Sequence, residues 1–222
     1  MSLRLEMLQV ARVAPKALED ASDLVRDFLL SQQHPDGGFC DRDGESDLYY
    51  TVFGLNALAA FQVEPDMNAV EKFLLKFEEG EGLDLVHLSC LCRCWGTLGQ
   101  KRMPKGLRKV LLNQLEAFRK PCGGWDNNPE REHGTAYGSF LALGAYQDLG
   151  KLPPKPFRIL QSLKHLETPD HAWNNHPNLP VGSTNPTAGA VVLLNNLHLP
   201  INAEVGKWLK KQLHPQGVFV AV

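Results

Sequence analysis

The sequence predicts an all-α fold of about nine or ten helices, arranged as helical hairpins. Amphipathic segments, with apolar residues three or four positions apart, alternate along the chain with segments that carry few charges. Between the two kinds of segment, a turn that contains glycine and ends in an aromatic residue recurs. The clearest copies are "FLLSQQHPDGGF" at residues 28–39 and "WLKKQLHPQGVF" at residues 208–219, which share six residues in register.

The amphipathic segments are predicted to be outer helices, because each has one apolar face and one charged face. They are residues 21–33, 67–77, 104–118, 156–166 and 202–213. The segments that follow the turns are apolar or small on almost every side, so we expect inner helices that are buried on both faces. They start at Asp47, Asp84, Glu132 and Asn185, and the acidic residues at the first three starts suit the positive end of the helix dipole.

The recurring turn predicts that its aromatic residue is buried. Gly37 can take a positive φ where an outer helix ends. Phe39 and Trp125 lie 86 residues apart, and weaker copies at residues 78–84 and around Trp173 give steps of 43 to 48 residues. Such steps fit a helical-hairpin repeat, so we expect Phe39 and Trp125 to be buried between repeats.

The composition is that of an ordinary soluble protein, with 222 residues, 43% hydrophobic side chains and a formal charge of −2. Lysines and arginines are scattered, so nucleic acid is not an expected partner. No run approaches the roughly 20 apolar residues of a membrane span, and residues 1–15 do not resemble a signal peptide. Of the five cysteines, Cys90, Cys92 and Cys94 crowd one predicted helix, which favours the reducing cytoplasm over a disulfide framework.

The segment "FLLSQQHPDGGF" followed by "DLYYTVFGLNALAAF" resembles the repeat of protein prenyltransferase β subunits and of the related squalene and terpene cyclases. It is most similar to the repeat of the geranylgeranyltransferase β subunit. The resemblance covers most of the chain and is strongest at residues 24–62 and 112–149. It implies an α/α toroid in which inner helices surround an apolar cavity. Residues 1–222 would form a single domain of about five repeats, a small or incomplete ring beside the family's about six hairpins.

The resemblance also implies a zinc ion that activates the cysteine thiol of a protein substrate, with an isoprenoid diphosphate in the apolar cavity. Matching the inner helices places Asp47 at the family's aspartate ligand, Tyr49 at its cysteine ligand and His87 at its histidine ligand. Cys90, one turn beyond His87, and Cys40, on the adjacent turn, are candidates for the missing third donor. The structural alternative is that Asp47 caps a helix and His87 is a buried histidine.

The residues expected to line a cavity for an isoprenoid or another ligand lie on the inner helices: Tyr49, Tyr50, Phe53, Arg93, Trp95 and Tyr137. Arg93 is conspicuous, because a charge on an apolar helix is costly unless it is paired. It either binds a ligand or bridges to an acid such as Glu132. The acidic residues 41–47 are expected to form a solvated loop. The chain has no Asp-x-Asp-Asp motif of the kind that cyclases use as an acid.

Two classes of function follow, and both stay open. One is a prenyltransferase-like enzyme that transfers an isoprenoid from its diphosphate to a protein cysteine. The other is a non-catalytic toroid that binds a lipid or a partner protein, and a second subunit or self-association would complete an open ring. Alternatively, residues 2–14 form a helix that packs near the C-terminal repeat, because the last predicted turn, at residues 214–219, has no inner helix of its own.

Overall fold

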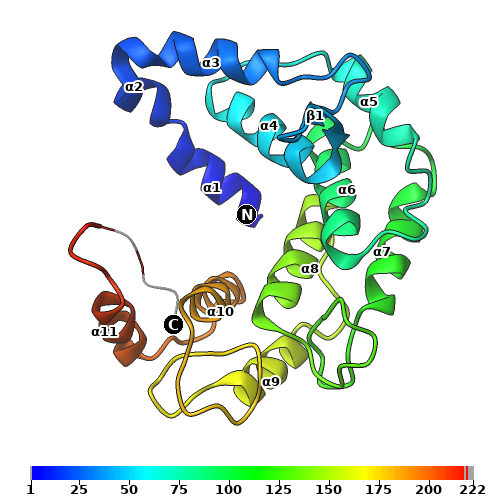
Figure 1. The fold of residues 1–222 in the computed structure, drawn as a ribbon. Helices are drawn as coiled ribbons and strands as arrows, with labels where there is room; N and C mark the ends of the chain where they lie inside the picture. Colours follow the sequence, from blue (N-terminus) through cyan, green and yellow to red (C-terminus); the bar gives the residue numbers. More distant parts are fainter. Residues whose placement is uncertain (1, 218, 220–222) are drawn as a thin grey trace. The chain divides into compact units, whose positions relative to one another are not determined.

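The protein is predominantly helical, with 55% of its residues in helices and 6% in strands, which confirms the predicted all-α class. The computed structural model describes residues 2–217 and residue 219 (Figure 1). Contacts between residues divide the chain into two compact units, residues 1–115 with 144–151 and residues 116–143 with 152–222. We refer to them as unit 1 and unit 2.

Unit 1 contains the whole N-terminal half of the chain, and from α3 onward its helices follow the predicted alternation of amphipathic and low-charge segments. Its elements are α1 (Leu3–Ala11), α2 (Ala14–Leu18), a 3-10 turn (Glu19–Ala21), α3 (Ser22–Ser31), β1 (Phe39–Cys40), β2 (Ser46–Asp47), α4 (Leu48–Ala60), α5 (Met67–Leu75), α6 (Leu85–Leu98) and most of α7 (Leu107–Ala117). Helix α4 packs chiefly against α6 and also contacts α1 and α3, while α5 packs against α6 (Figure 1).

The two inner helices of unit 1 begin where the sequence predicts, because an aspartate caps each of them. The Asp47 carboxylate accepts hydrogen bonds from the backbone N–H groups of Tyr49 and Tyr50, at 2.7 and 3.1 Å. The Asp84 carboxylate accepts one from the backbone N–H of His87, at 2.8 Å. Both carboxylates therefore satisfy donors that the helix itself leaves unpaired.

The first turn buries its aromatic residue, as predicted. Gly37 has a φ of +102°, and the Phe39 side chain is only 2% exposed. The Phe39 N–H donates to the Thr51 hydroxyl on α4 at 2.9 Å. The ring lies directly on Gly54, where an added Cβ would overlap it. Glycine at this position therefore allows the ring to reach the backbone of α4.

Asp36 links the same turn to β2 and to the end of α5 through hydrogen bonds. Its carboxylate accepts hydrogen bonds from the Gly38 N–H at 3.0 Å, the Ser46 hydroxyl at 2.7 Å and the Lys76 ammonium at 2.7 Å. Burial alone would raise the pKa of Asp36, but these hydrogen bonds together hold it below its usual range.

Unit 2 contains two further turns of the same construction. Its elements are the first part of α8 (Ala136–Asp148), within which the division between the units falls, then α9 (Phe157–Leu166), α10 (Thr184–Asn196) and α11 (Ala203–Lys211). The Trp125 N–H donates to the Ser139 hydroxyl at 3.2 Å. The Trp173 N–H donates to the Thr187 hydroxyl at 3.0 Å. Both tryptophans are buried.

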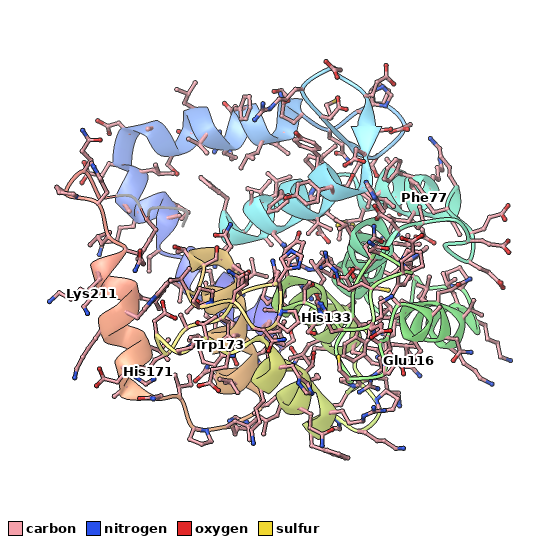
Figure 2. All side chains as sticks on the ribbon, turned by 60° about the horizontal axis from the view of Figure 1, so that its bottom comes forward. Phe77, Glu116, His133, His171, Trp173 and Lys211 are labelled. Atoms are coloured by element: carbon pink, nitrogen blue, oxygen red, sulfur yellow. The ribbon has the colours of Figure 1, made fainter. Side chains whose placement is uncertain are left out.

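The turn before α10 has no glycine at the position that corresponds to Gly37, and His171 takes its place with a φ of +68°. His171 and Trp173 are labelled in Figure 2. Each turn is closed by the same antiparallel bridge between residues six apart: Gln33 with Phe39, Arg119 with Trp125, Glu167 with Trp173, and Leu213 with Phe219.

One local prediction is wrong. The inner helix expected at Glu132 begins at Ala136, because the backbone first bridges Trp125 to Thr135 and the Thr135 hydroxyl accepts the Gly138 N–H at 3.0 Å. Residues 41–45 form the largely exposed loop that the sequence predicts, and the two residues that follow form the strand β2, which pairs antiparallel with β1.

The predicted N-terminal helix is present as α1, which Ser2 caps by accepting the Leu5 N–H at 3.4 Å. Its expected packing against the C-terminal segment stays a prediction. Val218, inside the last predicted turn, and Met1 lie outside the described residues. Among the helices that are described, none is long and apolar enough to cross a membrane.

Candidate functional site

Three aromatic side chains form an exposed face on α4, in unit 1. Tyr49 is 38% exposed, Tyr50 is 36% exposed and Phe53 is 54% exposed, whereas Leu48 and Val52 on the same helix are buried. The rings meet edge to face, with centroids 5.9 Å apart for Tyr49 and Tyr50 and 4.8 Å apart for Tyr49 and Phe53. We call these three residues the aromatic face. It can take up an apolar ligand, because clustered exposed aromatics bury a large area when covered.

His87 lies between two carboxylates at the N-terminal ends of α4 and α6. Its Nδ1 is 2.8 Å from Asp84 Oδ1, and its Nε2 is 3.6 Å from Asp47 Oδ2. Burial would raise the pKa of Asp84, but its hydrogen bonds with His87 hold that pKa below its usual value. Asp84 thus orients the imidazole so that Nε2 points toward Asp47.

The structure brings together two of the three predicted zinc ligands, Asp47 and His87. Cys90 lies one turn further along α6, and burial raises the pKa of its thiol to about 12, so the thiol is protonated near neutral pH. Within the described part of the chain, no group of three histidine, cysteine, aspartate or glutamate side chains is arranged to hold a metal ion. A catalytic zinc site requires three protein ligands, so the donor set present here does not fit one.

Arg93 is paired with an acid, and that acid is Asp148 at the end of α8. Arg93 Nε lies 3.4 Å from Asp148 Oδ2, and Arg4 Nε lies 3.1 Å from Asp148 Oδ1. Burial raises the pKa of Asp148, and the two guanidinium groups oppose that rise. The sequence suggested Glu132 as the acid and gave no signal for Asp148, which stands 55 residues after Arg93.

The other predicted cavity residues lie in different surroundings. Trp95 is completely buried, beside a small cavity that Asp148 also lines. Tyr137 is exposed on the part of α8 that belongs to unit 2. Of the six predicted residues, only Tyr49, Tyr50 and Phe53 are therefore shown to share one surface.

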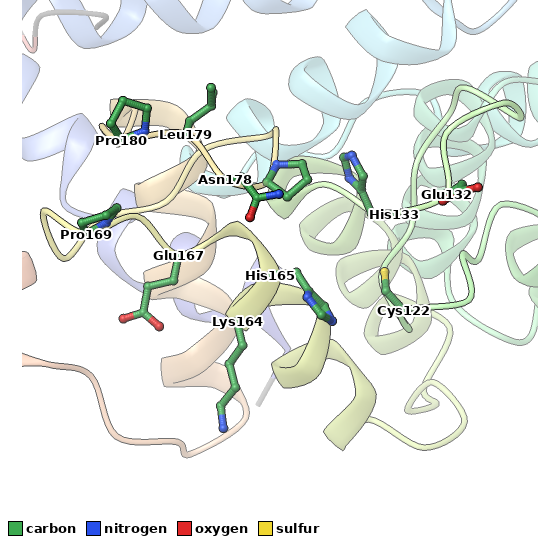
Figure 3. Close-up of a pocket in the computed structure, with 11 residues that line it drawn as sticks. Cys122, Glu132, His133, Lys164, His165, Glu167, Pro169, Asn178, Leu179 and Pro180 are labelled. Carbon is green, nitrogen blue, oxygen red and sulfur yellow. The ribbon is translucent and has the colours of Figure 1, made fainter.

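Unit 2 contains a cavity of about 820 Å³ that the sequence did not indicate. Cys122, His133 and His165 line it together with the loop around Asn178 (Figure 3). The Cys122 sulfur accepts the Gly134 N–H at 3.2 Å and lies 3.3 Å from the Ser162 hydroxyl. Most residues that line this cavity lie in loops, and only Lys164 and His165 lie at the end of α9. Loops have no helical or strand periodicity, which is why sequence patterns missed the cavity.

Comparison of the chain with protein-family models and with curated proteins finds no match.

Proposed function

We propose that this chain is a prenyltransferase-like α/α toroid, a small or incomplete ring, that binds an isoprenoid or another apolar chain on the aromatic face of α4. The observation that carries the proposal is the exposure of Tyr49, Tyr50 and Phe53 together on a helix whose other side is buried. Exposed aromatic rings in contact with one another are unfavourable in water unless a ligand or partner covers them.

The turns support the toroid part of the proposal. Four turns carry the same six-residue bridge, and three of them donate the aromatic N–H to a hydroxyl on the following inner helix. From α3 to α11, amphipathic and low-charge helices alternate in the order that the prenyltransferase-like repeat implies.

Transfer of the isoprenoid to a protein cysteine is the second candidate function. The approach of His87 Nε2 to Asp47 Oδ2 favours it, because these are the two positions that match zinc ligands in the resemblance. Bound zinc would activate a substrate thiol by stabilising the thiolate. Since the described residues supply two donors and no third, we derive no transfer step and place ligand binding first.

The binding proposal is tested by titrating the protein with farnesol, an isoprenoid alcohol without a phosphate, and following intrinsic tryptophan fluorescence. Phe53 is 54% exposed. Covering that part of a phenylalanine removes about 100 Å² from water, which is worth up to about 2.5 kcal/mol. Phe53→Ser should therefore weaken farnesol binding by about tenfold or more.

Leu75→Ser is the matched control, because Leu75 is an exposed apolar residue on the outer helix α5. It should leave farnesol affinity unchanged. Equal affinity in the wild type and in Phe53→Ser would reject the aromatic face as the site. The wild type could instead fail to bind farnesol but bind a partner protein that Phe53→Ser does not bind. The ligand of the aromatic face would then be a protein and not a lipid.

The zinc-dependent candidate is tested separately by metal analysis of the purified protein. Tyr49→Cys supplies a thiol at the position that matches the family's cysteine ligand, and should raise zinc content toward one ion per chain. His87→Ala in that background should abolish binding. If both variants contain as much zinc as the wild type, any metal binds elsewhere and the transfer hypothesis is rejected.

A further inference from the structure

The cavity of unit 2, about 820 Å³ in volume, is large enough for a ligand of short-peptide size. We call it the Cys122 cavity. Cys122 lines it together with two imidazoles, His133 and His165, while Leu179 and Pro180 lie toward its other end (Figure 3). Two carboxylates and one ammonium group also line it: Glu132, Glu167 and Lys164. A lining with both signs of charge and an apolar end suits a ligand that carries an ammonium group and carboxylates.

The cavity contains a nucleophile that solvent can reach. Of the cysteines that the structure describes, Cys122 alone lines this cavity, and it is only half-buried. Three other cysteines are buried on α6, where burial raises the pKa of each thiol: Cys90, Cys92 and Cys94. Cys40 is half-buried too, but it belongs to unit 1.

The repeat of the turns shows what kind of group the position of Cys122 accommodates. In each turn, this position comes three residues after the first residue of the closing bridge. Asp36 occupies it in the first turn and Asp170 in the turn before α10. Burial alone would raise the pKa of both carboxylates, but their hydrogen bonds hold each below its usual value. This position of the turn therefore stabilises a negative charge.

The segment that returns beside the turn donates to this position. The Gly182 N–H donates to the Asp170 carboxylate at 3.1 Å, and the Gly134 N–H donates to the Cys122 sulfur at 3.2 Å. Each glycine stands 12 residues after its acceptor. The sulfur thus receives the same backbone donor that the carboxylate receives.

The outer helix that follows the turn supplies a second contact. On α11, Trp208 Nε1 donates to the Asp170 carboxylate at 2.7 Å. On α9, the Ser162 hydroxyl lies 3.3 Å from the Cys122 sulfur. A hydroxyl can donate to a sulfur that carries negative charge. Two donors are therefore placed to stabilise a thiolate, which is the form of cysteine that attacks a disulfide.

We propose that the Cys122 cavity binds a small peptide disulfide of the glutathione type, and that Cys122 forms a mixed disulfide with it. The Cys122 thiolate attacks one sulfur of the ligand, and the S–S bond of the ligand breaks. The other half leaves as a thiolate and takes up the proton that Cys122 released. The ligand disulfide is reduced as the Cys122 sulfur is oxidised, so no other oxidant takes part. This site belongs to unit 2 and does not depend on the aromatic face of α4.

The test is to incubate the full-length protein with glutathione disulfide and to follow adducts by intact mass spectrometry, with peptide mapping to locate them. We expect one glutathione per chain, on Cys122, and a rate about tenfold or more above that at Cys40. Hydroxyethyl disulfide, which is uncharged and contains no peptide, is compared in parallel. Its preference for Cys122 over Cys40 should be several-fold smaller. Ser162→Ala should slow the reaction at Cys122 several-fold with both disulfides, because it removes one donor to the sulfur.

Cys40→Ser is the matched control, because Cys40 is a half-buried cysteine that does not line the cavity. It should form the Cys122 adduct at the wild-type rate, whereas Cys122→Ser should lose that adduct. Equal rates at Cys40 and Cys122 with glutathione disulfide would show that exposure alone governs the reaction, and would overturn the proposal. The same ratio of the two rates with both disulfides would overturn it as well, because the cavity would then not recognise the peptide. Absence of an adduct on Cys122 would also overturn it.

Discussion

Gly54→Ala should destabilise the wild-type protein but stabilise a protein that already carries Phe39→Ala. In the wild type, the added methyl group would overlap the Phe39 ring, which has to move within a packed seam. Such overpacking costs about 1–3 kcal/mol, whereas alanine gains about 1 kcal/mol over glycine inside a helix. The net change is a loss of about 1 kcal/mol.

Phe39→Ala alone should cost about 3–5 kcal/mol, because the ring is 2% exposed and leaves a cavity against α4. Once the ring is gone, the methyl group at residue 54 no longer overlaps its three nearest atoms, which all belong to the Phe39 ring, and it partly fills the space. The double variant should then be about 1 kcal/mol more stable than Phe39→Ala, so the sign of the Gly54→Ala effect reverses between the two backgrounds.

The assay is urea unfolding of the four proteins followed by far-UV circular dichroism, with unchanged m-values as the condition for comparing free energies. Gly144→Ala is the control, since it lies inside α8 and an added Cβ there meets no neighbour. It should stabilise both backgrounds by about 1 kcal/mol. The same effect of Gly54→Ala in both backgrounds would refute the packing of Phe39 on α4. A cost below about 1 kcal/mol for Phe39→Ala would show that the turn contributes little to stability.

Three further predictions follow from other contacts. Ser139→Ala should cost about 1–3 kcal/mol in urea unfolding, because the buried Trp125 N–H loses its acceptor, while Ser139→Thr should cost much less. Because the folded-state pKa of Asp36 is depressed, its contribution to stability is complete above about pH 4 and is lost as the pH falls toward the folded-state value. Asp36→Asn should therefore flatten the acid limb of a stability-against-pH curve, and an unchanged limb would contradict the hydrogen bonds assigned to this carboxylate. Arg4→Met should lower stability by about 1–3 kcal/mol, because it removes a hydrogen bond to the buried carboxylate of Asp148, and no loss would mean that this ion pair is not formed in solution.

The sequence was sufficient to place the starts of α4, α6 and α10 to within a residue, but not the start of α8. Asp47 and Asp84 stand immediately before apolar runs, and a capping carboxylate is a local signal that defines a helix start. Glu132 gave the same kind of signal, but the backbone bends at this residue and then forms a bridge between Trp125 and Thr135, so α8 begins only at Ala136. A backbone bridge between positions ten residues apart cannot be predicted from the order of apolar and polar side chains.

The candidate site was foreseen only in part, for a similar reason. The resemblance to the prenyltransferase repeat implied that Asp47 and His87 approach each other, because both positions match zinc ligands of that family. The aromatic face could be read from three residues of one helix. The ion pair of Arg93 with Asp148 and the unpaired indole of Trp95 depend on how α1, α6 and α8 pack, and periodicity describes one helix at a time.

The hydroxyl that accepts the turn amide also restricts which sequences can build such a hairpin. Phe39, Trp125 and Trp173 are followed by a serine or threonine acceptor 12, 14 and 14 residues later. Alanine or valine would fill the same volume but leave a buried N–H without a partner, so exchange is limited to residues that carry a hydroxyl. An aromatic residue with Ser or Thr at this spacing is therefore a signature for recognising distant relatives, even where the surrounding residues have diverged beyond detectable similarity.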